Sequence, residues 1–319
     1  MHMKMRFLRS TAILLALAAI LLTACNSREH PAEGNTVCFT DALGRVVCVE
    51  KEPERVAALI GSFADVWLLS GGEICATSED AWEDFGLELP GAVSIGGAHS
   101  PNLENLLYAD PDFVIASAST ASNVQMCDVL ENAGIPVAYF DVDNFQDYLQ
   151  MLSICTDITG RKDLYQRNGL DVAARIDAIK AACTHSGLSE QERTVLLLRA
   201  SSGFVKAKGS QGTILGEMLA DLDCINIADS DASLLDSLGV ESVIRQEPYR
   251  IFVVTMGNDT EKALENLDRL MKENPAWGTL DAVTEGRLHL MDRRMFNIKP
   301  NARWADSYEE LANLLLGKE

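Results

Sequence analysis

The 319-residue chain lacks the short motifs that identify common α/β enzymes. It has neither a G-x-G-x-x-G dinucleotide loop nor a G-x-x-x-x-G-K-[ST] phosphate loop. Around Ser210 the sequence is Lys-Gly-Ser-Gln-Gly, without the first glycine of a G-x-S-x-G nucleophile turn. Asp141 and Asp143 could act as a glycosidase pair, but neighbouring acids arise easily in a chain rich in acidic residues. We therefore predict no catalytic residues and keep an extracytoplasmic α/β enzyme as the least favoured alternative.

The chain also has few ligands for a bare metal ion. It contains no C-x-x-C pair and no cluster of Cys and His at zinc spacing. Beyond the N-terminal segment the histidines are His30, His99, His185 and His289, which are widely scattered. We predict no metal site, and capture of bare zinc or manganese is set aside.

Positive charge is scarce, with 27 Lys and Arg against 47 Asp and Glu, a net charge of −20. Such a balance argues against a nucleic-acid partner. The acidity itself is typical of a well-solvated surface and identifies no particular ligand. The hydrophobic content of 47% indicates a globular protein with a substantial core.

The longest apolar run is too short to span a membrane, which takes about 20 residues. Lys4, Arg6 and Arg9 precede an uncharged stretch from Ser10 to Ala24, the layout of a secretory signal peptide over residues 1–24. The chain turns polar directly after Cys25. We therefore expect export, with residues 26–36 forming a flexible tether.

The end of this segment, Leu22-Thr23-Ala24-Cys25, resembles the bacterial lipobox. The resemblance implies that Cys25 receives lipid, and that residues 25–36 tether an extracytoplasmic lipoprotein to the cell membrane. The alternative is an ordinary signal peptide whose Cys25 joins a disulfide.

Two of the remaining cysteines, Cys38 and Cys48, flank a turn at residues 41–45 between two strand-like runs. Across such a hairpin they come within reach of each other, so we predict a Cys38–Cys48 disulfide. The pairing of the other five, at positions 75, 127, 155, 183 and 224, is left open.

From residue 37 to 157, short apolar runs alternate with helical patterns, as in an α/β domain. The unit SPNLENLLYADPDFVIA at 100–116 is repeated as SLGVESVIRQEPYRIFV at 237–253. Each copy is a helix, a proline and a strand, with Ser100 and Ser237 expected to cap the helices. The repeat predicts two similar α/β lobes, each with a mainly parallel sheet, although chance matching of such units is the alternative.

Between the lobes, residues 158–184 carry apolar side chains mostly at helical spacing. We predict one long helix that joins an N-terminal lobe at 37–157 to a C-terminal lobe at 185–319, with a ligand cleft between them. A single helical connection would permit only small opening motions.

Together these stretches resemble the substrate-binding proteins of ABC importers for ferric siderophores, haem and cobalamin, from about Thr36 to the C-terminus. The segments that carry the resemblance are residues 41–45, 53–56, 100–116, 134–137, 157–160, 212–228, 237–253 and 277–287. The resemblance implies a monomer that delivers its ligand to a permease and its ATPase. It also implies that Glu104 and Glu241, one in each copy of the repeat, dock onto the permease. Stabilisation of the helix dipole is the alternative role for both.

In open α/β lobes, ligands bind beyond the carboxyl ends of the strands. The loops expected there supply the candidate ligand-binding residues Trp82, His99, Arg199, Arg294, Phe296 and Arg303. Arginines and aromatic rings suit an anionic ferric siderophore. Each arginine could instead form a surface salt bridge, Trp82 could belong to the core, and His99 could be an ordinary loop histidine. The sequence therefore predicts a binding protein for an iron-siderophore or similar metal chelate, with a corrinoid or haem as the alternative ligand.

Overall fold

A computed structural model describes residues 34–257 and 259–318 of the chain. The predicted signal peptide and Cys25 lie outside the described residues. Within these residues, no helix is both long enough and apolar enough to cross a membrane.

The first elements of the described residues form a two-stranded hairpin, β1 (Thr36–Thr40) and β2 (Val46–Glu50). Cys38 and Cys48 form a disulfide across it, the pair that the turn at 41–45 predicts. Asp41 holds this turn, since its carboxylate accepts hydrogen bonds from the backbone N–H groups of Leu43 and Arg45, both at 3.0 Å. The hairpin therefore rests on a disulfide and on a carboxylate-bonded turn.

The first lobe contains a five-stranded sheet in the order β5-β4-β3-β6-β7, in which all neighbours are parallel. Its central strands are buried on both faces, as the crossover helices of parallel sheets require. The strands are β3 (Val56–Ala58), β4 (Ile74–Thr77), β5 (Val93–Ser94), β6 (Phe113–Ser117) and β7 (Val137–Phe140). The helices are α2 (Gly61–Leu69), α3 (Asp80–Glu83), α4 (Leu103–Tyr108), α5 (Ala121–Val124), α6 (Cys127–Asn132) and α7 (Phe145–Ile158).

The second lobe contains a sheet in the order β10-β8-β11-β12, again parallel, to which β9 adds an antiparallel partner of β8. Its strands are β8 (Thr194–Ala200), β9 (Val205–Lys208), β10 (Ile225–Asn226), β11 (Arg250–Thr255) and β12 (Leu288–Met291). The helices up to β11 are α10 (Glu190–Arg193), α11 (Ile214–Asp221), α12 (Ile227–Ser230), α13 (Ala232–Asp236) and α14 (Val240–Gln246). Those after it are α15 (Thr260–Glu273), η2 (Pro275–Thr279), α16 (Asp281–Thr284), α17 (Arg293–Phe296), η3 (Asn301–Arg303) and α18 (Trp304–Leu316).

The two sheets have corresponding strand orders, which confirms the two parallel-sheet lobes that the repeat predicts. In each sheet the first parallel strand, β3 or β8, lies between the next parallel strand, β4 or β10, and the strand of the repeated unit, β6 or β11. The repeated units themselves form the helix–strand pairs α4–β6 and α14–β11.

The predicted serine caps of the two repeated helices are wrong. The first helix is capped by Asn102, whose side chain accepts a hydrogen bond from the backbone N–H of Asn105. The second has Gly239 at the cap position and no side-chain cap. Ser100 and Ser237 lie two residues before these cap positions, because the backbone is still extended at Asn102 and at Gly239.

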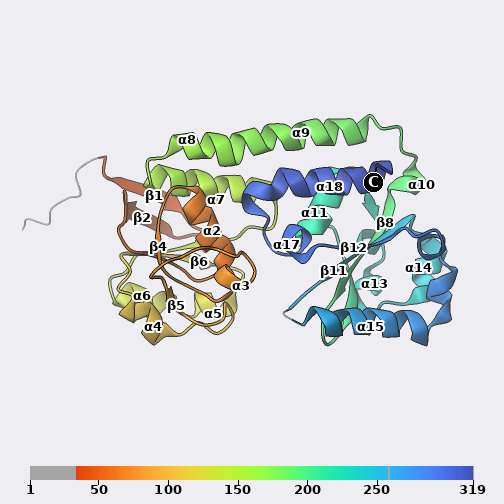
Figure 1. Cartoon of the computed structure of the whole chain (residues 1–319), viewed down its shortest axis with the longest axis horizontal. Helices are drawn as coiled ribbons and strands as arrows, with labels where there is room; N and C mark the ends of the chain where they lie inside the picture. The colour runs from red at the N-terminus through yellow and green to blue at the C-terminus, as the bar shows by residue number, and fades with distance from the viewer. Residues whose placement is uncertain (1–33, 258, 319) are drawn as a thin grey trace, which may run out of the picture. The chain divides into compact units, whose positions relative to one another are not determined.

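The segment predicted as one helix at 158–184 is helical from Lys162 to Thr184. It consists of α8 (Lys162–Tyr165), the π-helical turn η1 (Gln166–Leu170) and α9 (Asp171–Thr184). The C-terminal helix α18 lies alongside α9 (Figure 1). Arg175 joins them through ion pairs with Asp306 at 2.9 Å and Glu309 at 3.2 Å.

One hydrophobic cluster contains side chains from both lobes, such as Phe63 and Trp67 from the first and Phe252 and Trp304 from the second. A separate cluster covers the other face of each sheet. The shared cluster means that the two sheets are not independently packed bodies, since removing either lobe would expose apolar surface on the other.

Candidate ligand-binding site

The carboxyl ends of strands from both sheets border a cavity of about 490 Å³, here called the interlobe cavity. In the first lobe its walls follow β3, β4, β5 and β6, and in the second lobe they follow β11 and β12. This is where open parallel sheets bind ligands. The lining residues are Ile60, Ser62, Glu79, Asp80, Glu83, Asp84, Phe85, Gly97, Ala98, His99, Ser100, Thr120, Met256, Gly257, Arg293, Asn297, Ile298 and Lys299.

The first-lobe wall of the interlobe cavity is acidic. The helix α3 and the residues on either side of it bring four carboxylates to one stretch of chain, Glu79, Asp80, Glu83 and Asp84. Asp80 has a structural role, because it accepts hydrogen bonds from the Gly61 backbone N–H at 2.9 Å and from the Ser78 hydroxyl. Glu79 and Glu83 are exposed and free to meet a ligand.

The two lobes also bond to each other at the cavity. Arg293 donates both terminal nitrogens to Asp84, one of them at 3.0 Å. Arg294 donates to the backbone carbonyl of Phe85 at 2.6 Å. The ion pair uses the planar guanidinium as a two-pronged donor, a geometry that resists rotation of one lobe against the other.

Two ionisable groups near the cavity are shifted by burial. Burial raises the pKa of Asp65, although the side-chain amide of Asn301 donates to that carboxylate at 2.8 Å and Arg294 also lowers its pKa. Burial lowers the pKa of Lys299, while Asp143, Asp141 and Asp147 act in the opposite direction. Lys299 thus carries a partly desolvated positive charge into the cavity wall.

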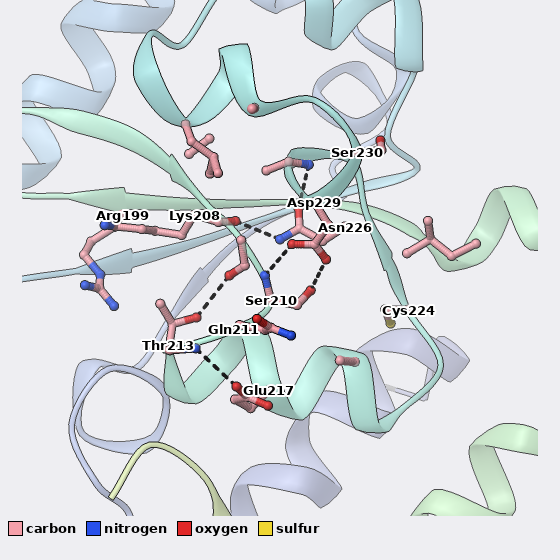
Figure 2. A pocket seen from close by; sticks show the side chains of 18 of the residues that line it. Arg199, Lys208, Ser210, Gln211, Thr213, Glu217, Cys224, Asn226, Asp229 and Ser230 are labelled. Atoms are coloured by element: carbon pink, nitrogen blue, oxygen red, sulfur yellow. Dashed lines mark hydrogen bonds between the residues drawn. The ribbon is translucent and has the colours of Figure 1, made fainter. Parts of the chain in front are cut away.

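A second cavity of about 1130 Å³, here called the second-lobe cavity, lies where β9 and β10 flank β8 (Figure 2). Its walls include the loop from Gly209 to Thr213 and the turn around Asp229. The Asp229 carboxylate accepts from the Ser210 backbone N–H at 2.7 Å and from the Ser210 hydroxyl at 2.6 Å. The Asn226 side chain donates to the Lys208 carbonyl at 2.7 Å. This network fixes the backbone of the wall.

Three cations line the second-lobe cavity: Arg199 on β8, and Lys206 and Lys208 on β9. Figure 2 shows Arg199 apart from the hydrogen-bonded network of Ser210, Asn226 and Asp229. Nε of Arg199 is buried and has no hydrogen-bond partner among the described residues. Burial lowers the pKa of Arg199, and burial together with Arg199 and Lys206 lowers the pKa of Lys208.

The residues predicted to bind ligand are distributed unevenly. His99 is exposed and lines the interlobe cavity, and Arg199 lines the second-lobe cavity. Trp82 is partly buried against the shared core and lines neither cavity, in agreement with its alternative role as a core residue. Phe85, three residues further along the chain, lines the interlobe cavity.

The expectation for Phe296 is wrong in this structure. Its side chain is 1% exposed and packs in the shared core, because α17 turns Met295 and Phe296 inward. Arg294 and Arg303 line a separate cavity of about 220 Å³, which shares Phe85 and Lys299 with the interlobe cavity. Arg303 also lies 3.7 Å from Asp306 on the surface.

Several site residues are absent from the sequence-based candidates. Lys206, Lys208 and Lys299 are cations in the cavity walls, and Asp84 is the partner of Arg293. The alternation Lys-Ala-Lys at 206–208 is a signal for two charges on one face of a strand. Nothing in the sequence pairs Asp84 with a residue more than 200 positions away.

The glutamates predicted to dock onto a permease, Glu104 and Glu241, are both exposed, and each is the second residue of its helix. Among the described residues, no group of three or more His, Cys, Asp or Glu is placed to hold a metal ion.

Two parallel-sheet lobes with a ligand-sized cavity at their facing strand ends are the architecture of a two-lobed binding protein. A family model described as "Periplasmic binding protein" matches residues 56–295. The chain belongs to this family, whose members are non-enzymatic binding proteins of ABC transporters.

Curated relatives and solved structures are similar over most of the chain. A putative ABC transporter substrate-binding lipoprotein of Bacillus subtilis, YhfQ, is 22% identical, covering 94% of this chain and 96% of the relative. The Fe(3+)-citrate-binding protein YfmC of the same organism is 23% identical, covering 88% and 87%.

Among solved structures, Staphylococcus aureus SirA complexed with staphyloferrin B has a TM-score of 0.64 at 18% identity, covering 89% of this chain and 98% of that one. Staphylococcus aureus IsdE complexed with heme has a TM-score of 0.66 at 14% identity, covering 82% and 98%. At these identities the solved structures establish the fold. The ligand of this chain has to be inferred from the residues that line its cavities.

Proposed function

We propose that this protein is the extracytoplasmic substrate-binding component of an ABC importer and that it captures a ferric siderophore or a similar metal chelate. The observation that carries the proposal is the interlobe cavity, which is lined by loops at the strand ends of both sheets. Its volume of about 490 Å³ lies within the range of about 300–1,000 Å³ for small-molecule sites. The relative YfmC is a Fe(3+)-citrate-binding protein, and the similar structure of SirA is a complex with staphyloferrin B.

The charged walls favour a chelate over an apolar ligand. Glu79 and Glu83 on one side, and Arg293 and Lys299 on the other, would each be costly to cover with a group that cannot bond to them. Haem is the alternative with a structural relative, and His99 in the cavity wall is the residue that could bind its iron. A corrinoid is the second alternative, to be distinguished by experiment.

Delivery of the ligand to the permease would depend on two exposed glutamates and on a lipid tether. Glu104 and Glu241 would meet basic residues of the permease, and a lipid on Cys25 would keep the protein at the membrane through the tether at 25–36. The name of the relative YhfQ supports a lipoprotein. We further propose that the lobes at 37–157 and 185–319 open only slightly, because the helical run at 158–184 and the shared core connect them.

A thermal-shift panel tests the function. The panel comprises ferric citrate, a neutral ferric trihydroxamate, a ferric catecholate, haem and cobalamin, each beside its iron-free or cobalt-free counterpart where one exists. A ligand at 100 times its Kd stabilises the folded state by about 2.7 kcal/mol, so the true ligand should raise the Tm by roughly 5 °C. No shift with any ferric chelate, haem or cobalamin would contradict the proposal.

A further inference from the structure

We propose that Arg199, Lys206 and Lys208 form an anion subsite that recognises the free carboxylates of a ferric polycarboxylate chelate. The inference rests on the proposed function and narrows its ligand class. It assigns a role to the second-lobe cavity, which has no part in the proposed function as stated above.

The three cations are placed together by strand register. In the antiparallel pair of β8 and β9, Arg199 lies directly opposite Lys206, and Leu197 lies opposite Lys208. Opposite residues point to the same face of a sheet, and residues two apart on a strand do so as well. Arg199, Lys206 and Lys208 therefore project from one face, and all three line the same cavity.

This arrangement is costly without an anion. None of the three forms an ion pair with an acidic side chain of the part of the chain that the structure describes. Lys206 contacts an aromatic ring instead, with its Nζ 5.4 Å from the ring centroid of Phe204. Like charges held close in a partly desolvated wall repel each other. In a chain with 47 acidic residues against 27 basic ones, three neighbouring cations left without acid partners indicate a site kept for an external anion.

The two carboxylates that line the same cavity are already engaged. Asp229 accepts two hydrogen bonds from Ser210, and Glu217 accepts one from the backbone N–H of Gly212 at 3.2 Å. Both serve the loop from Gly209 to Thr213. They position the wall of the cavity, and the three cations keep their donors for a ligand.

Arg199 lies near the carboxyl end of β8, beside the strand that leads to Met256, although the two cavities share no lining residue among the described residues. The backbone N–H of Met256 donates to the carbonyl of Ala200 at 2.8 Å, and Met256 lines the interlobe cavity while Arg199 precedes Ala200. The proposal requires that a chelate in the interlobe cavity extends its carboxylates past this contact toward Arg199. The acidic first-lobe wall, with Glu79 and Glu83, repels those carboxylates and so favours the same orientation.

The walls favour carboxylates over aromatic ligands. Among the described residues that line the two cavities, Phe85 is the only Phe, Tyr or Trp. Catecholates and haem present flat rings, which proteins hold mainly by stacking on aromatic side chains. Lysine ammonium groups and an arginine fork are instead suited to charge-assisted bonds with carboxylate oxygens.

The test measures Kd values by titration calorimetry on the full chain, with ferric citrate, a neutral ferric trihydroxamate and haem as the probes. The variant is Lys206→Gln with Lys208→Gln, and the control is Lys272→Gln, a surface lysine of α15 paired with Asp268. We expect the double variant to weaken ferric citrate about 10- to 100-fold and the control to leave it unchanged. Raising the salt concentration should weaken binding to the wild type more than to the double variant. If the double variant is unstable, the single variants replace it. Each removes one charge and should show a smaller loss of ferric citrate affinity.

The outcomes separate this inference from the function on which it rests. Equal ferric citrate affinity in the wild type and the double variant would remove the subsite while leaving the importer role intact. Binding of the trihydroxamate or haem without ferric citrate would overturn the polycarboxylate class alone. Failure of all three probes to bind overturns the polycarboxylate class as well, and if the wider panel above is also negative, the proposed function falls with it.

Discussion

The two lobes share a strand order but carry opposite charge at their strand ends. The first-lobe loop around α3 brings Glu79, Asp80, Glu83 and Asp84 to the interlobe cavity. The second lobe brings Arg293 and Lys299 to the same cavity, and Arg199, Lys206 and Lys208 to the second-lobe cavity. The helix–strand framework is therefore repeated, whereas the loops that meet a ligand have diverged, as expected when packing constrains the framework and recognition constrains the loops.

This division of charge gives a ligand one preferred orientation. A chelate with free carboxylates lowers its energy by directing them to the second lobe, and any cationic group is favoured beside Glu79 and Glu83. The ion pair between Asp84 and Arg293 is where the two kinds of wall meet directly. Substitutions at surface glutamates, at this ion pair and at a buried carboxyl group would change the two lobes to different extents.

The largest effect is expected where the lobes are alike, at the exposed glutamates of the repeated helices. Replacing Glu104→Lys and Glu241→Lys together should abolish uptake of the iron chelate by whole cells, because both contacts with a basic permease surface become repulsive. The Kd for the ligand should stay unchanged, since neither residue lines a cavity.

A matched control for that experiment is Glu265→Lys, on the second-lobe helix α15. Each single docking variant should retain partial uptake if the two lobes contribute comparably. Full uptake by the double variant would show that Glu104 and Glu241 do not dock onto a permease and that the two helices are alike only in their fold.

A smaller effect is expected from the ion pair that joins the unlike walls. A double-mutant cycle with Asp84→Asn and Arg293→Gln should give a coupling free energy of about 1–2 kcal/mol in urea unfolding. The reason is that both side chains are largely shielded, at 17% and 23% exposed. The exposed pair Asp268 and Lys272 should give only about 0.3–0.5 kcal/mol. Equal coupling in the two cycles would mean that the interlobe pair does not hold the lobes together.

The helix–strand framework could be predicted from the sequence, because it depends on local sequence patterns. A helix, a proline and a strand recur at 100–116 and 237–253, and the turn at 41–45 places Cys38 beside Cys48. These patterns depend on chain geometry within a few residues, which tertiary packing rarely overrides.

The ligand-binding residues were less accessible, because side-chain direction is set by distant neighbours. His99 and Arg199 follow strands and do line cavities, but Phe296 lies in the core since α17 packs against α18. Lys206 and Lys208 have the alternation of an ordinary solvated edge strand, and only their register with Arg199 reveals a cluster. The predicted serine caps are wrong for a simpler reason: each helix begins later than expected, since the backbone is still extended at Asn102 and at Gly239.

The smallest effect is expected from Asp65, because burial raises the pKa of its carboxyl group above the usual range. Between its unfolded and folded pKa values, the folded state binds more protons than the unfolded state. Stability therefore rises as pH falls through the folded pKa and levels off below the unfolded pKa. Asp65→Asn should flatten this part of the Tm–pH curve and keep an acceptor for the Asn301 amide. The exposed Asp268→Asn variant is the control and should leave the curve unchanged. A Tm–pH curve of the same shape in the wild type and in Asp65→Asn would show that Asp65 ionises normally and that its surroundings are better hydrated than its burial indicates.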